Sequence, residues 1–348
     1  MKNKSVIYSG IIYVAAFLYV IWGILGILDL KNLVYAGYQI DSDRKIYQVD
    51  KGSPADIAGM KIGDIIIDVI RENDKITNTK KKIPSERGRS KVGEEREYVV
   101  DRNGETLTLQ FTLGATTNKK KVYRVIYYIM GLVFISLGLF THYRVKSALS
   151  LSYAAFAVFF ACFFAVLFPI GPYIGNTLLS TIAAGTGISF ELISLSVLVH
   201  FLLKYPPASN FIKKRSKQIW PYVPVILVLV FCWITVIFLP GKTSISDQVF
   251  YASLIIFTFV YFIWSLVILI RKFVKANSEI RRTSGLNLIL WGGCLGLPSI
   301  FISVIISFIT NDSTLSGGGY VLLLIIAIPL FFMLAIFKQN KNFIESLK

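Results

Sequence analysis

Eight separate segments of the sequence are apolar over a length that crosses a lipid bilayer. A hydrocarbon core about 30 Å thick requires roughly 20 apolar residues of helix. The segments are residues 6–28, 122–140, 148–168, 178–203, 222–239, 248–270, 286–309 and 320–337. Only 16% of the 348 residues are charged, whereas soluble proteins carry about 25%. The sequence therefore predicts a multi-pass α-helical membrane protein with about eight transmembrane helices.

One long polar interval, residues 29–121, separates the first two of these segments. We expect it to fold as a single domain, because roughly ninety residues are enough for a core of their own. The first segment is longer than a signal-peptide core and is followed by no cleavage site of small residues. The expected organisation is a signal-anchor helix at 1–28, the polar domain at 29–121, a seven-helix bundle at 122–337 and a short tail at 338–348.

Lysine and arginine mark one side of the predicted membrane. Three loops rich in these residues alternate with three that together carry one: 141–147, 204–220 and 271–285 against 169–177, 240–247 and 310–319. Cytoplasmic loops are the enriched ones, so we expect both termini in the cytoplasm of a plasma-membrane protein and the polar domain outside. This distribution fits the formal net charge of +17 to membrane topology. Membrane lipid is therefore expected as a partner, and nucleic acid is not.

A short turn-and-helix pattern, "DKGSPADIAGMKIGDIIIDV" at residues 50–69, stands out in the polar interval. Ser53 is placed to cap a short helix, and Pro54 suits its first position, where a missing N–H costs nothing. The side of that helix expected to be buried consists of Ala55, Ile57 and Ala58. The pattern predicts a one-turn capped helix.

Strands are predicted on both sides of this helix. Residues 46–49 and the apolar run 65–69 have strand character, and we expect the second strand to be buried. Gly59 is placed to end the helix in a left-handed conformation, and Gly63-Asp64 turns the chain into the second strand. Further on, alternating residues around Arg102-Asn103-Gly104 predict a β-hairpin. The interval is expected to be a small α+β domain.

The segment from Val49 to Ile66 resembles the PDZ domains of bacterial envelope proteins. The residues that carry this resemblance are Gly52, Ser53, Pro54, Ala55, Gly59, Gly63 and Asp64. Such domains bind extended peptides, often at their C-termini, by adding a strand to a sheet edge. The resemblance places the carboxylate-holding turn and its strand at "YAGYQI", with the candidate ligand-binding residues Tyr35, Gly37, Tyr38, Gln39 and Ile40.

The sequence departs from the PDZ pattern where the groove helix is expected, at residues 78–95. Pro84, Gly88 and Gly93 interrupt that stretch, and its few apolar residues show no helical period. A shallow or absent hydrophobic pocket would follow. Peptide binding, packing and a homodimer contact all stay open as roles for this face.

No motif of catalytic or metal chemistry appears in the sequence. An intramembrane zinc protease needs two histidines one turn apart beside a glutamate, but His142 and His200 lie in different predicted helices. No serine-protease triad or phosphate-binding loop is found. We expect no enzyme activity, no metal and no cofactor.

Three polar residues inside the predicted bundle are candidates for function: Glu191, His200 and Asn287. Glu191 lies near the middle of its helix, where a charge is costly unless neutralised or paired. It is interpreted either as a ligand contact or switch, or as a protonated side chain bonded to a neighbouring helix. His200 is rotated about half a turn from it at 100° per residue. Asn287 begins a segment whose Gly292–Gly296 pair is typical of close helix packing.

The whole layout resembles the membrane sensor module of ComP-type quorum-sensing histidine kinases. The residues that match are Val199-His200-Phe201 and Tyr205-Pro206-Pro207. The resemblance implies signal transduction in a two-component system. Because no histidine follows the last segment, the chain is expected to be a sensor module alone: a truncated relative, the partner of a separately encoded histidine kinase, or a receptor for an extracellular peptide. The alternatives are an adaptor that presents envelope substrates to a membrane protease and an accessory subunit of a transporter.

Overall fold

The computed structural model describes residues 2–40, 43–71, 91–167, 177–206, 215–238, 243–310, 321 and 323–346. Contacts divide the chain into two compact units. The first, here called the helical unit, contains residues 1–23, 123–170 and 184–348; the second, the α/β unit, contains residues 24–122 and 171–183. Each is described by itself.

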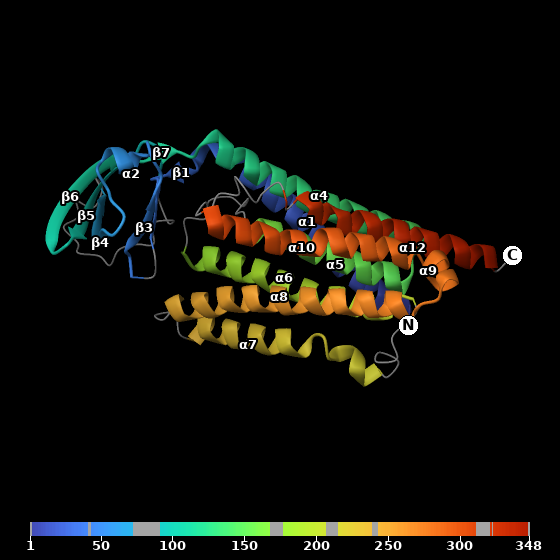
Figure 1. Ribbon diagram of the computed structural model, residues 1–348. Helices are drawn as coiled ribbons and strands as arrows, with labels where there is room; N and C mark the ends of the chain where they lie inside the picture. Colours follow the sequence, from blue (N-terminus) through green and yellow to red (C-terminus); the bar gives the residue numbers. More distant parts are fainter. Residues whose placement is uncertain are drawn as a thin grey trace. The chain divides into compact units, whose positions relative to one another are not determined.

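Long helices make up the helical unit and run beside one another (Figure 1). They are α1 (Lys2–Leu28), α4 (Asn118–Val145), α5 (Ala148–Leu167), α6 (Thr177–Lys204), α7 (Val223–Phe238), α8 (Thr243–Lys275), α10 (Leu286–Thr310) and α12 (Ala327–Ser346), with the shorter helices α9 (Ser278–Ser284), η4 (Arg215–Ile219) and η6 (Leu323–Ile326) between them. The last turns of α1 and the first turns of α4 and α6 belong to the α/β unit. The last helix continues to Ser346, so the residues expected as a tail are helical as far as that residue.

Six of these helices are long and apolar enough to cross a membrane. The stretches are Ile7–Leu28, Lys120–Val145, Gly185–Lys204, Ile255–Lys275, Leu286–Ser303 and Leu323–Lys341. The other two expected spans coincide with α5 and α7, whose described apolar stretches, Ala148–Cys162 and Val223–Ile234, are shorter. A membrane-embedded protein is supported, and the count of eight spans stays a prediction.

Several helix ends with basic residues lie together at one end of the helical unit. Phe140 near the end of α4 packs edge-on against Phe337 of α12. At the end of α6, the Tyr205 hydroxyl donates to the carbonyl of Ser284 in α9. Lys272 near the end of α8 donates to the carbonyl of Leu203 at 3.0 Å. The described ends of α6, α8 and α9 therefore adjoin one another, and the end of α4 adjoins α12.

Glycines let α10 approach its neighbours closely, as the small-residue pair predicts. A Cβ built on Gly292 would lie 2.9 Å from the Cβ of Phe331, and one on Gly296 would lie 2.4 Å from the Cγ1 of Ile328. Both neighbours belong to α12. These positions have no room for a side chain, so this face of α10 serves helix packing.

The α/β unit consists of short antiparallel pairs around one turn of helix. Its elements are η1 (Leu30–Asn32), β1 (Val34–Tyr35), β2 (Tyr38–Ile40), β3 (Ile46–Val49), α2 (Pro54–Ile57), β4 (Ile65–Arg71), β5 (Glu95–Arg102), β6 (Glu105–Thr112) and β7 (Gly114–Ala115). Strands β4, β5 and β6 form one sheet in that order, while β2 pairs with β3 and β1 with β7. The expected order of strand, capped helix, strand and hairpin is confirmed.

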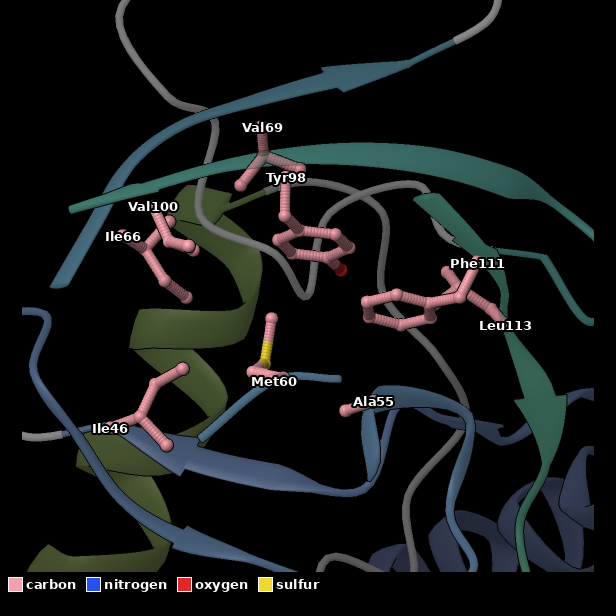
Figure 2. Close-up of a cluster of buried hydrophobic side chains, with 9 residues drawn as sticks. All are labelled: Ile46, Ala55, Met60, Ile66, Val69, Tyr98, Val100, Phe111 and Leu113. Carbon is pink, nitrogen blue, oxygen red and sulfur yellow. The ribbon is translucent and has the colours of Figure 1, made fainter. Parts of the chain in front are cut away.

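One hydrophobic core holds these elements together (Figure 2). It consists of Ile46, Ala55, Met60, Ile66, Val69, Tyr98, Val100, Phe111 and Leu113. The Tyr98 and Phe111 rings, from the paired strands β5 and β6, stack with centroids 4.7 Å apart. Alternate residues of β5, Tyr98 and Val100, point inward, as the period of two in a strand requires.

Two burial predictions in this unit are wrong. Ile57 is 80% exposed, because it lies on the outer side of the single helical turn, whereas Ala55 is buried and Ala58 packs partly buried against the core. Strand β4 is not buried on both faces: Ile66 points inward, whereas Ile65 and Ile67 are 42% and 46% exposed. Adjacent side chains of a strand face opposite ways, and this sheet covers its core from one side.

Candidate functional site

The turn at residues 35–40 packs directly against the capped helix. Gly37 has a positive φ of 91°, and a Cβ at this position would lie 2.0 Å from the Cβ of Ser53. Only glycine fits, because a side chain would meet both an unfavourable backbone conformation and a neighbouring residue. The turn assigned to peptide binding and the capped-helix motif that carries the PDZ resemblance thus meet at Gly37 and Ser53.

Hydrogen bonds fasten this turn to α2. The Ser53 hydroxyl accepts from the backbone N–H of Asp56 at 3.2 Å, as a capping residue does, and lies 3.3 Å from the Gly37 carbonyl. The N–H of Asp50 donates to the same carbonyl at 2.7 Å, and the N–H of Ala55 donates to the carbonyl of Ala36 at 3.0 Å. Ser53 caps the helix and positions the turn at once.

Strand β2, which follows the turn, has a strand on one side only among the described residues. It pairs with β3, from Tyr38 opposite Val49 to Ile40 opposite Ile46. The Tyr38 ring packs edge-on against Tyr98 of the core. The Gln39 side chain accepts from the Tyr47 hydroxyl at 2.5 Å. Of the segment where the groove helix is expected, residues 78–95, the part from 78 to 90 lies outside the described residues.

Tyr35, Asp50 and Lys120 form a polar cluster beside the turn. The Tyr35 hydroxyl donates to Asp50 Oδ2 at 2.5 Å, and Lys120 Nζ lies 3.3 Å from the same oxygen and 4.5 Å from the Tyr35 ring centroid. Burial raises the pKa of the Asp50 carboxyl, but the bonds from Tyr35, Lys120 and Gln48 outweigh it and the pKa lies below its usual value. Burial and the bond to Asp50 raise the pKa of Tyr35.

A short ladder joins the turn to the start of α4. Val34 pairs with Ala115 and Tyr35 with Gly114. The N–H of Thr116 donates to the carbonyl of Leu33 at 2.9 Å. Strand β1 leads directly into the turn and β7 leads directly into α4, so the ladder and Lys120 both connect the candidate site to that helix.

The remaining motif residues shape the fold around α2. Arg102 donates to both carboxylate oxygens of Asp64, at 2.7 and 2.8 Å, and to the carbonyl of Gly59 at 2.7 Å. Burial raises the pKa of Asp64, but Arg102 and the N–H of Lys61 lower it below its usual value. Gly59 and Gly63 have positive φ values of 83° and 99°, and Gly52 has one of 73°. These residues set the turns at the two ends of α2.

Glu191 is fully buried in α6. Its Oε1 accepts from the Thr258 hydroxyl of α8 at 3.3 Å, whereas its Oε2 has no hydrogen-bond partner among the described residues. His200 lies elsewhere: its Nδ1 is 3.3 Å from the carbonyl of Gln218, and its ring packs near Tyr222. The structure therefore does not bring the two together. Asn287 is exposed in the first turn of α10.

Lys272 was expected in a basic loop, and that expectation is wrong. Helix α8 continues to Lys275, and Lys272 is only 9% exposed. Its Nζ donates to the carbonyls of Leu203 and Tyr205, at 3.0 and 2.5 Å, where α6 ends and leaves such groups unbonded. The signal was present in the sequence, because Lys272 lies three and four residues after the buried Leu269 and Ile268, on the same helix face.

We compared the chain with family models, curated proteins and solved structures. No family model matches the chain, and no significant similarity to a curated protein or to a solved structure is found. Within the described ranges, no group of three or more His, Cys, Asp or Glu side chains is arranged to hold a metal ion.

Proposed function

We propose that this chain is a non-catalytic membrane sensor whose α/β unit is a PDZ-like domain that binds the C-terminal end of an extracellular peptide. The observation that carries the proposal is the close contact between Gly37 and Ser53, which holds a glycine turn in front of a strand that has one strand neighbour among the described residues. A peptide added beside β2 would gain main-chain hydrogen bonds, with its carboxylate at the turn.

The connection to α4 supports a role in signalling. Strand β1 ends at the turn, its partner β7 continues into α4, and Asp50 is bonded both to Tyr35 and to Lys120 of α4. A peptide that shifts the turn would also act on this ladder and on the first turn of α4. Signal transfer then requires two arrangements of the helices that the peptide distinguishes.

The proposed partner is a separate cytoplasmic histidine kinase that contacts the basic end of the helical unit. Exposed residues there include Arg144, Lys217, Arg271, Arg282 and Lys338. Their enrichment favours a cytoplasmic location for these helix ends. The extracellular location proposed for the α/β unit rests on its place in the sequence, between the first two expected spans.

Peptide binding is tested with the full chain in lipid nanodiscs and a library of fluorescent peptides that end in apolar residues. We expect saturable binding to a subset with a free C-terminal carboxylate, and at least a tenfold loss when the same peptides are amidated. Gly37→Ala should abolish binding, because the added methyl group displaces Ser53 and the turn.

Gly52→Ala is the matched control. Gly52 also has a positive φ, but a Cβ there meets nothing within 4 Å, so the variant carries the backbone strain without the contact. It should keep binding within about threefold, a difference below 1 kcal/mol. Equal affinity for free and amidated peptides, or no binding by any member of the library, would count against the PDZ-like site.

The cytoplasmic partner is tested by proximity labelling and gentle co-purification from native cells. Recovery of a histidine kinase or a response regulator is the expected result. Recovery of a membrane protease instead favours the adaptor, and recovery of a transporter favours the accessory subunit; either outcome would overturn the sensor.

A further inference from the structure

Glu191 has an incomplete set of bonds that helix packing does not explain. It lies near the middle of α6 with none of its surface exposed. Thr258 donates to Oε1, but Oε2 is unbonded among the described residues. As a carboxylate, Oε2 lacks a donor; as a carboxylic acid, one oxygen carries a proton that lacks an acceptor.

Other buried polar groups of the helical unit show that this fold can satisfy such side chains. The Tyr153 hydroxyl donates to the carbonyl of Pro329 at 2.6 Å, and the Tyr261 hydroxyl donates to that of Pro221 at 2.6 Å. Lys272 donates to two carbonyls. Buried polar atoms are normally bonded, so the unbonded Oε2 means that the described protein groups compensate a negative charge on Glu191 only through Thr258.

A second polar atom without a partner occurs on the same neighbouring helix. Ser265 Oγ in α8 is buried and unbonded among the described residues. It lies seven residues after Thr258, which is two helical turns along the same face. Polar groups therefore continue along α8 from the position of Glu191.

The surroundings of Glu191 select the kind of ligand. Among the described ion pairs, none joins Glu191 to a Lys, Arg or His. Among the described residues, the Cys162 thiol of α5 interacts electrostatically with Glu191 and donates to the carbonyl of Val158 at 3.8 Å. A hard metal cation takes about six oxygen ligands, far more than one carboxyl and one hydroxyl provide. A proton needs a single carboxylate oxygen.

We propose that Glu191 is a reversible proton-binding site whose charged and neutral forms favour different packings of α6 against α5 and α8. One proton from water adds to the carboxylate and gives the neutral acid; its release restores the charge. The charged form requires polar neighbours such as Thr258, whereas the neutral form tolerates the apolar bundle. Each form thereby selects a helix arrangement. This site goes beyond the peptide-binding proposal and does not depend on it.

The test uses a hydrophobic carbodiimide, which modifies carboxyl groups in apolar surroundings when they are protonated. The full chain in nanodiscs is treated across a range from about pH 5 to about pH 9, and the adduct at Glu191 is measured by mass spectrometry. We expect at least a tenfold decrease from the lowest to the highest pH. The protection of the α5 and α8 amides, corrected for the intrinsic pH dependence of hydrogen exchange, should change over the same range, and Glu191→Gln should abolish that change while Glu191→Asp restores part of it.

Glu279 provides the matched control, because it is an exposed carboxylate on α9. Glu279→Gln should leave the pH response intact. No adduct at Glu191, or the same amount at every pH, would overturn the proposal and leave a permanently charged or permanently neutral packing group. Protection by sodium ions at constant pH would also overturn it, in favour of a metal cation. The pH dependence of the Glu191 adduct in the wild type tests reversible proton binding even if Glu191→Gln does not fold.

Discussion

The α/β unit and the helical unit satisfy their polar groups in different ways. In the α/β unit, the Ser53 cap and the bond from the N–H of Lys61 to Asp64 each span three residues. In the helical unit, Tyr205 reaches Ser284 and Tyr153 reaches Pro329, at separations of 79 and 176 residues. The α/β unit thus combines contacts within its turns with longer ones such as Arg102 to Asp64, across 38 residues, whereas the contacts that join different helices of the bundle depend on how distant helices pack.

Truncating a buried ring should also cost more stability in the α/β unit than in the helical unit. This is the largest effect that we expect. Tyr98→Ala removes a ring that stacks on Phe111 inside the α/β unit, and it should cost about 3–5 kcal/mol of that unit's stability. The measurement is hydrogen exchange of the β5 and β6 amides in the full chain. Amides of α10 should be unaffected.

Phe332→Ala is the counterpart in the helical unit, where the ring is fully buried and stacks on Phe201. Its effect on exchange in α12 should be smaller, because lipid is as apolar as the helix interior and only packing is lost. Equal destabilisation by the two variants would show that the helical unit is stabilised like a water-soluble core, and the comparison would fail.

Asp64→Asn should destabilise the α/β unit by about 2 kcal/mol at neutral pH. The change removes the charge from a buried carboxylate that holds Arg102, and the exposed part of Arg102 keeps the loss below that of a fully buried pair. Because the folded pKa of Asp64 lies below the unfolded value of about 3.9, its contribution is present above that pH and is lost as the pH falls through the folded pKa. Unfolding followed against pH should therefore show wild type and variant converging in acid. A constant difference down to about pH 2 would contradict the assignment.

Lys272→Met should destabilise the helical unit by about 1–2 kcal/mol, because two carbonyls at the end of α6 lose their donor. Faster hydrogen exchange near Leu203 is the expected result. Lys275→Met is the control, since Lys275 is exposed on the same helix. If both variants behave alike, the buried amine does not stabilise the end of α6.

The smallest effect is expected at the β5–β6 turn. Asn103 has a positive φ of 56°, which glycine adopts freely and a β-branched residue does not. Asn103→Val should cost about 1 kcal/mol, whereas Asn103→Gly should be nearly neutral. Hydrogen exchange of the β6 amides should be faster in Asn103→Val than in Asn103→Gly. Equal protection in the two variants would show that the positive φ at residue 103 does not affect stability.

Local features of the α/β unit were predictable from the sequence because they depend on neighbouring residues. The Ser53 cap, the left-handed Gly59 and the Asn103-Gly104 hairpin all appear where the pattern predicts them. Ile57 was predicted to be buried, but it lies on the solvent-exposed side of the single helical turn. The groove helix and the peptide-binding role stay predictions.

The sequence by itself determined where the long apolar helices occur and where the turns of the α/β unit lie, because helix length, periodicity and turn chemistry act over a few residues. Only the tertiary structure decided that Gly37 meets Ser53, that Lys272 caps α6 and that Thr258 bonds to Glu191. Each of these contacts joins different elements, the last two across 67 residues. No local pattern encodes such a pairing, because it depends on how each helix or strand packs against the others.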